Sequence, residues 1–162
     1  MKIAEKKLRY KIYESIEELP ENLQLLLKNA RKETQNAFAP YSNFKVGAAL
    51  QLENQMIIGG NNQENAAFPS GLCAERTAIF YAQSQYPNVP IDAIAITAFF
   101  KDKITDETIK PCGACCQVLS EAEKRGGKNM TIVLDGQKQI EVIEGVNMLL
   151  PFRFSGEELK HL

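Results

Sequence analysis

The chain has 162 residues, a formal net charge of −1, 44% hydrophobic residues and 24% charged residues. This length is typical of one compact domain. The near-neutral charge, with no block of lysines and arginines, argues against a nucleic-acid partner. No apolar run approaches the roughly 20 residues of a membrane span, and the N-terminus lacks an apolar signal segment. We therefore expect a cytoplasmic protein, in which the four cysteines serve a metal or catalysis before disulfides.

The first 18 residues are predicted to form an N-terminal extension to a single domain that spans residues 19–162. The extension is charged, and Leu8, Tyr10 and Ile12 alternate along it. Such alternation is typical of a strand with one buried face. The extension is therefore either a short edge strand or a loosely docked segment, and it contains no group that we would assign to catalysis.

From residue 20 on, the spacing of apolar residues predicts helices and strands in alternation. Helical spacing predicts helices over residues 20–38, 72–84 and 111–126, followed by two short helices over residues 145–150 and 156–162. Alternating or continuous apolar runs predict strands over residues 44–52, 56–61, 91–100, 130–134 and 140–142.

This order predicts an α/β fold, in which a mixed five-stranded sheet lies in a three-layer α-β-α arrangement. The first two strands would form a hairpin, and the apolar run at residues 91–100 would be covered on both faces. Asp135-Gly136 is a turn signal that precedes an edge strand at residues 140–142. Pro111 suits the first position of a helix, because the N–H that it lacks has no partner there.

Three cysteines in two short motifs predict a metal centre. Cys73 stands at the start of one predicted helix, and Cys112 and Cys115 stand three apart at the start of the next. Helix N-termini favour anionic groups such as thiolates, so two of them can converge on one ion. Three thiolate ligands leave the fourth tetrahedral position of Zn²⁺ to water, which is typical of catalytic rather than structural zinc.

Two charged residues follow Cys73 directly. Glu75 lies two positions after this ligand, so it can face the metal pocket without binding the ion and can transfer protons. Three thiolates around Zn²⁺ leave one net negative charge, which opposes the loss of a proton from bound water. We hypothesise that Arg76 donates hydrogen bonds to the cysteine sulfurs and compensates this charge.

Taken together, Cys73-Ala74-Glu75-Arg76 and Pro111-Cys112-Gly113-Ala114-Cys115 resemble the motifs of the small cytidine deaminases. The likeness continues in the run from Tyr41 to Ala49, in the run from Asn62 to Ala67 and in Leu149-Leu150-Pro151, and it covers about residues 22–155.

The resemblance implies a hydrolytic enzyme that converts cytidine and 2′-deoxycytidine to uridine and 2′-deoxyuridine with release of ammonia. It implies one zinc ion per subunit, bound by Cys73, Cys112 and Cys115, with Glu75 as the proton shuttle. Members of this family of similar length are usually homotetramers with their sites at subunit interfaces. The partners implied are a small nucleoside and further copies of the chain, with no membrane.

The same resemblance implies a set of contacts to the nucleoside. These are ribose hydroxyl contacts from Asn62 and Glu64, a pyrimidine ring packed on Phe44, and a hydrogen bond from the Ala74 backbone N–H to the base carbonyl. Phe154, shortly after Pro151, would reach the base bound by a neighbouring subunit.

One position departs from the family pattern. The family usually has arginine directly after the second cysteine of the Pro-Cys-Gly-x-Cys motif, and this chain has Cys116 there. One positive charge is therefore missing, and more of the compensation is left to Arg76. Cys116 lies four residues after Cys112 and is a competing ligand in principle, but a buried free cysteine is the favoured interpretation.

Each of these residues also has a structural explanation. Glu75 is favoured in a first helical turn by the dipole, Asn62 and Glu64 can satisfy their own loop backbone, and Phe44 can be an ordinary core residue. Arg76 can form a surface ion pair, and Phe154 can pack within the tail.

Other functions share part of the pattern. A deaminase of a cytosine-nucleoside antibiotic would share the zinc motifs and differ in the pocket around Phe44 and Phe154. A nucleic-acid deaminase usually has histidine as its first ligand, which this chain lacks. A non-catalytic zinc or redox protein would use Cys112 and Cys115 alone, or would close the site with a fourth ligand. The only histidine, His161, stands next to the C-terminus and is a poor candidate for that ligand.

Overall fold

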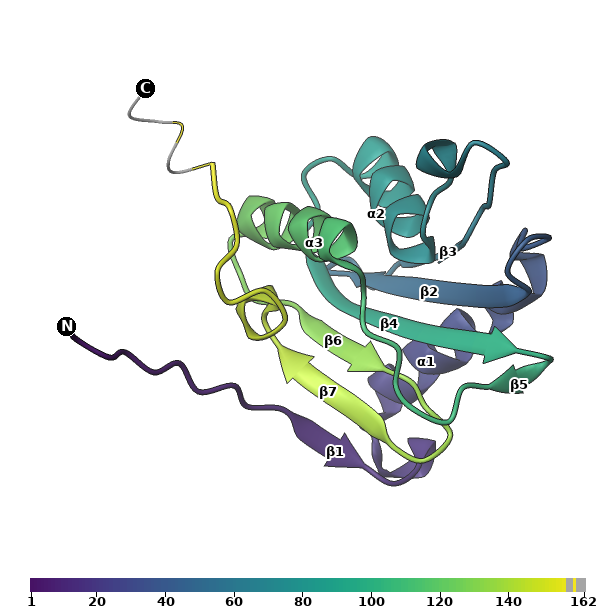
Figure 1. The fold of residues 1–162 in the computed structure, drawn as a ribbon, viewed down its shortest axis with the longest axis horizontal. Helices are drawn as coiled ribbons and strands as arrows, with labels where there is room; N and C mark the ends of the chain where they lie inside the picture. The colour runs from purple at the N-terminus through teal and green to yellow at the C-terminus, as the bar shows by residue number, and fades with distance from the viewer. Residues whose placement is uncertain (157–158, 160–162) are drawn as a thin grey trace.

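A computed structural model of the chain describes residues 1–156 and 159. A mixed sheet runs through the molecule, with helices on both faces (Figure 1). Its strands are β1 (Lys11–Tyr13), β2 (Phe44–Leu52), β3 (Ile57–Asn61), β4 (Ile91–Phe100), β5 (Lys103–Ile104), β6 (Thr131–Leu134) and β7 (Ile140–Glu144). The α-helices are α1 (Glu21–Glu33), α2 (Ala74–Gln85) and α3 (Gly113–Gly126).

The strands lie in the order β1-β7-β6-β4-β2-β3, and the short β5 pairs with the end of β4. Only the pair of β4 and β6 is parallel among the described strand pairs, because α3 returns the chain across the sheet between them. Consecutive strands β2 and β3 form the predicted antiparallel hairpin, and β6 and β7 form another. The predicted α/β class with a mixed sheet is confirmed.

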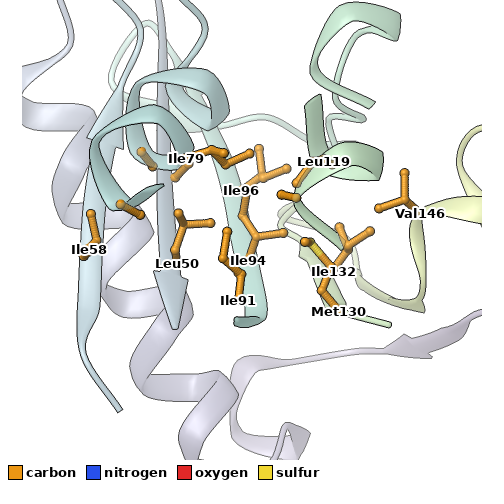
Figure 2. Packing of buried hydrophobic residues seen from close by; sticks show 14 of the residues in the cluster. Leu50, Ile58, Ile79, Ile91, Ile94, Ile96, Leu119, Met130, Ile132 and Val146 are labelled. Atoms are coloured by element: carbon orange, nitrogen blue, oxygen red, sulfur yellow. The ribbon is translucent and has the colours of Figure 1, made fainter. Parts of the chain in front are cut away.

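Side chains of the central strands alternate between two apolar layers. Ala49, Ala95 and Val133 face α1, whereas their chain neighbours Leu50, Ile96 and Ile132 face α2 and α3. Figure 2 shows the second layer, in which the strand side chains meet Ile79 of α2 and Leu119 of α3. All of these residues are almost completely buried, and each of the valine, leucine and isoleucine side chains stabilises the fold by about 1.5–3 kcal/mol. The central strands are therefore rigid supports for the ends of α2 and α3.

Two glycines let helices approach the sheet closely. A Cβ atom on Gly60 of β3 would lie 2.6 Å from the backbone nitrogen of Ala78 in α2. On the opposite face, a Cβ atom on Gly47 of β2 would lie 2.1 Å from the carbonyl oxygen of Ala30 in α1. Neither contact leaves room for a side chain, so glycine at these positions sets how near α1 and α2 lie to the sheet.

The structure corrects several details of the prediction. The sheet has seven strands where five were expected, because β1 and β5 add to it. β7 is not an edge strand, since β1 pairs with it on its outer side. Pro111 lies two residues before α3, which begins at Gly113. Of the helix predicted over residues 145–150, only a 3-10 turn at Val146–Met148 forms.

Other predictions near the termini have mixed outcomes. The helix predicted over residues 156–162 falls mostly outside the described residues. The boundary at residue 18 stays a prediction, although residues 11–13 within the extension form the outermost strand next to β7. No helix in the described part of the chain is long and apolar enough to cross a membrane.

Candidate active site

The starts of α2 and α3 bring three thiols together. Cys73 is the residue that precedes the first turn of α2, Cys112 precedes the first turn of α3, and Cys115 lies within that turn. The sulfur atoms of these three residues all lie within 4.8 Å of one another, and those of Cys112 and Cys115 are 3.5 Å apart. The structure therefore assembles the predicted set from two segments that are distant in the sequence.

This arrangement fits a zinc ion. Tetrahedral zinc holds its sulfur ligands at about 2.3 Å, which places two such sulfurs about 3.8 Å apart. The 3.5 Å separation of Cys112 and Cys115 and the 4.8 Å limit for all three sulfurs are compatible with that distance. Soft thiolate donors also favour zinc over the hard cations that prefer oxygen ligands. No fourth cysteine, histidine or carboxylate joins this group among the described residues, so one coordination position is left to a small molecule.

The electrostatics of the three thiols favour one thiolate. The pKa of Cys73 is lowered to about 5, because the Cys115 thiol donates to its sulfur and Arg76 adds a positive charge. The pKa of Cys115 is raised by the same contact with Cys73 and by burial. Metal binding requires all three thiols to lose their protons, so a bound ion would have to displace the protons of Cys112 and Cys115 as well.

Glu75 lies in the first turn of α2 and is only 4% exposed. Burial raises the pKa of its carboxyl group, with the negative charge of Cys73 as a further cause. Its own backbone amide, the Cys115 thiol and Arg76 act in the opposite direction but do not cancel the effect of burial. A carboxyl group with a raised pKa can both accept and donate a proton near neutral pH.

Arg76 contacts the metal-site thiols directly. Its Nη2 atom donates a hydrogen bond to the sulfur of Cys73 at 3.8 Å, and this contact raises the pKa of the guanidinium further. The Nε atom is buried without a hydrogen-bond partner among the described residues. The predicted contact to a cysteine sulfur is therefore present for Cys73.

A cavity of about 390 Å³ opens at the thiols. It has the size of a small-molecule site and combines apolar walls with a few polar groups. Its walls bring together five of the predicted site residues that are not metal ligands, namely Phe44, Asn62, Glu64, Glu75 and Arg76. Lys110, Ile109, Phe68 and Leu72 also line it. The sequence pattern did not identify these four, although Lys110 and Ile109 stand directly before the Pro111-Cys112 motif.

Asn62 and Glu64 already have backbone partners. The Asn62 side chain accepts from the Val46 N–H at 2.8 Å and donates to the Phe44 carbonyl at 2.9 Å. These contacts use one of the two N–H donors of the amide and leave the other available. The Glu64 carboxylate accepts from the N–H groups of Tyr41 and Ser42 and from the Ser42 hydroxyl. The hydrogen bond from the Ser42 hydroxyl is the main cause that lowers the pKa of Glu64, and the lowered pKa keeps this carboxylate ionised.

The remaining predicted residues lie in different surroundings. Ala74 is the first residue of α2, and its backbone N–H has no intrahelical partner. Phe154 does not line the cavity of its own chain; it is exposed, and its carbonyl accepts from the Gln117 side chain at 3.0 Å. Cys116 is buried and its thiol donates to the Pro111 carbonyl at 3.4 Å, away from the three converging sulfurs.

A protein-family model described as "Cytidine and deoxycytidylate deaminase zinc-binding region" matches residues 20–127, which includes all three thiols and Glu75. A protein named cytidine deaminase from Halalkalibacterium halodurans is 39% identical over 136 residues, which are 84% of this chain and 96% of the relative. The chain belongs to the cytidine deaminase family. The Cys73, Cys112 and Cys115 group is thus the candidate metal site of a member of a zinc-binding family.

Further relatives agree with this assignment. A second cytidine deaminase, from Sporosarcina psychrophila, is 36% identical over 140 residues, which are 86% of this chain and 96% of that protein. A crystal structure of cytidine deaminase from Burkholderia pseudomallei superposes with a TM-score of 0.69 at 38% identity, over 80% of this chain and 97% of that one. The similarity therefore extends over nearly the whole length of these relatives.

Proposed function

We propose that this protein hydrolyses the exocyclic amine of cytidine and 2′-deoxycytidine, giving uridine or 2′-deoxyuridine and ammonia. The observation that supports this activity is the meeting of three thiols and the buried Glu75 at one end of the cavity. The relatives named cytidine deaminase match this chain over nearly all of their own length, which supports the same reaction.

The chain supplies each part that such a reaction needs. A zinc ion held by Cys73, Cys112 and Cys115 would supply Lewis acidity to an attacking water. Glu75 would take one proton of that water and give it to the ring nitrogen of the pyrimidine, and it would then take the second proton, from the new hydroxyl group on the ring carbon, and give it to the leaving amine. Its burial supports this role, because a raised pKa suits a group that both takes and gives a proton.

Other groups would hold the nucleoside. The free N–H of Ala74 would bind the base carbonyl, and the ring of Phe44 would pack against the pyrimidine. Asn62 and Glu64 would contact the ribose hydroxyls, for which Asn62 keeps one N–H donor and Glu64 keeps its negative charge. Arg76 would offset the charge of three thiolates through the contact with Cys73.

We further propose that the protein is a cytoplasmic homotetramer. Phe154 is exposed and does not line the cavity of its own chain, so a contact to a base would have to be made in another subunit. Size-exclusion chromatography with light scattering would measure the number of chains, and a monomer would contradict this part of the proposal.

The activity is tested by ultraviolet spectroscopy of the zinc-loaded protein with cytidine, 2′-deoxycytidine, cytosine and cytidine monophosphate. We expect turnover of the two nucleosides. Turnover of neither nucleoside by protein that contains one zinc ion per chain would refute the proposed reaction. Metal analysis in parallel identifies a redox protein, which would hold no stoichiometric zinc.

A further inference from the structure

The segment at residues 107–111 carries one wall of the cavity and leads into a metal ligand. Ile109 and Lys110 line the cavity, and Cys112 follows at the start of α3. No backbone–backbone hydrogen bond joins residues 107–111 to any other described residue. Side chains must therefore hold this segment in place.

Glu141 of β7 makes the main side-chain contacts to this segment. One oxygen of its carboxylate accepts from the Thr108 hydroxyl at 2.9 Å and from the Lys110 ammonium at 3.0 Å. The same oxygen accepts from the Gln139 side chain at 3.0 Å. The Lys110 ammonium also donates to the hydroxyl and the carbonyl of Thr108, so the contacts form one closed cluster.

The position of Glu141 is fixed by the sheet. Its backbone pairs with Ile12 of β1 on one side and with Leu134 of β6 on the other. The residue is 6% exposed and Thr108 is 5% exposed, so water competes little with their hydrogen bond. Burial alone would raise the pKa of Glu141, but the Lys110 and Thr108 donors outweigh it and lower the pKa. Glu141 is therefore a fixed, ionised acceptor.

The link from Lys110 to Cys112 is short and stiff. Two residues span at most about 7 Å, and the intervening Pro111 has a fixed φ angle. The Pro111 carbonyl is held in turn by the Cys116 thiol at 3.4 Å. A shift of the Lys110 backbone would therefore be transmitted to Cys112 rather than absorbed by the chain between them.

We propose that Glu141 is a positioning residue for the candidate active site, which acts through Lys110 on both the Cys112 ligand and the cavity wall. The proposal rests on the proposed function in one respect, that Cys112 binds zinc. A purely structural Glu141 would stabilise the fold without affecting the metal, and the two roles are distinguishable by a measurement of zinc release.

The experiment compares the rate at which a chelating dye removes zinc from wild type, Glu141→Gln, Lys110→Met and the double variant. Glutamine has the shape of glutamate and keeps an acceptor for Thr108, and methionine keeps most of the lysine stem, so folding should survive. The control is Lys138→Met, which removes an exposed ion pair of 2.7 Å to Glu107 at the edge of the same segment.

We expect both single variants to release zinc about tenfold faster than wild type, at the lower end of the effect of groups that orient metal ligands. The double variant should be no faster than the singles, because both substitutions break one contact. The control should match wild type. The KM for cytidine should rise in the same variants, since Ile109 and Lys110 lose their support.

Unchanged zinc release in both single variants, with or without a lower melting temperature, would overturn the proposal. Additive effects in the double variant would also overturn it, because Glu141 would then not act through Lys110. Faster release without any turnover of cytidine by wild type would leave Glu141 as a positioning residue and refute the proposed reaction instead. A wild type that binds no zinc would refute both.

Discussion

Replacement of Glu75 by glutamine removes one proton-transfer group and changes little else. The substitution preserves the shape of the side chain, so the cavity of about 390 Å³ keeps its volume. Glu75 is only 4% exposed, so bulk water does not readily take over its role. Proton transfer by a positioned side chain contributes about 10²–10⁴-fold. We expect the upper end, a loss of about 10⁴-fold in kcat, which corresponds to about 5.4 kcal/mol.

The assay follows the ultraviolet change of cytidine at saturating substrate, together with the zinc content and the melting temperature of the same preparation. Glu75→Gln should keep one zinc ion per chain and its fold, because Glu75 is not one of the converging ligands. A matched control is Glu33→Gln, since Glu33 is half-buried and bonds to Asn61 outside the cavity. A kcat within tenfold of wild type would remove Glu75 from the proposed role.

Three further predictions concern charge, ligand identity and stability. Arg76→Gln should shift the pH–rate profile by about one unit or more toward alkaline pH, because loss of the cation makes the site less acidic; a profile identical to that of wild type would contradict charge compensation. Cys116→Ser should keep one zinc ion per chain, since its sulfur lies outside the converging group; loss of zinc, measured by atomic absorption, would make Cys116 a ligand. Asp135→Asn should lower the free energy of unfolding by about 2 kcal/mol, because it weakens the charged hydrogen bonds between a buried carboxylate and Arg31, whose side chain is 29% exposed. The Asp135 carboxylate is fully buried and accepts two hydrogen bonds from Arg31 at 2.8 Å, and denaturant titration would show no loss if this pair contributed nothing.

The metal site was predictable because its chemistry is local in the sequence. Cys112 and Cys115 stand three residues apart at the start of one helix, and the Cys73-to-Arg76 motif stands at the start of another. Only their meeting required the fold, and the alternation of helices and strands was enough to predict that class. Apolar alternation predicted β2, and a near-continuous apolar run predicted β4, which is indeed buried on both faces of the sheet.

Features that depend on pairing were not predictable from local pattern. β1 is only three residues long and gains its stability from β7, so the alternation along the extension allowed a short edge strand but could not decide between it and a loosely docked segment. The short β5 is similar, because it forms only by folding back onto the end of β4. Helix starts were also displaced, since Cys112 rather than Pro111 directly precedes α3.

Side-chain contacts between residues distant in the sequence could not be predicted either. Lys110 stands beside a recognisable motif, but its partner Glu141 lies on a strand that was expected at the sheet edge. Hydrogen bonds also join the side chains of Asn62 and Glu64 to the backbone of residues 41–46, and these bonds likewise depend on how the two segments meet in the fold. Sequence spacing indicates which groups are available, and only the fold decides which of them a given side chain contacts.

The central claim is that the three thiols and Glu75 form a zinc-dependent cytidine deaminase site. The most direct test is ammonia release from cytidine by wild type loaded with zinc, and then by the same preparation after the zinc is removed by a chelator and after it is restored. We predict turnover that is lost with the metal and regained with it, at one zinc ion per chain. Absence of turnover at full zinc occupancy, or turnover that persists without zinc, would contradict the claim.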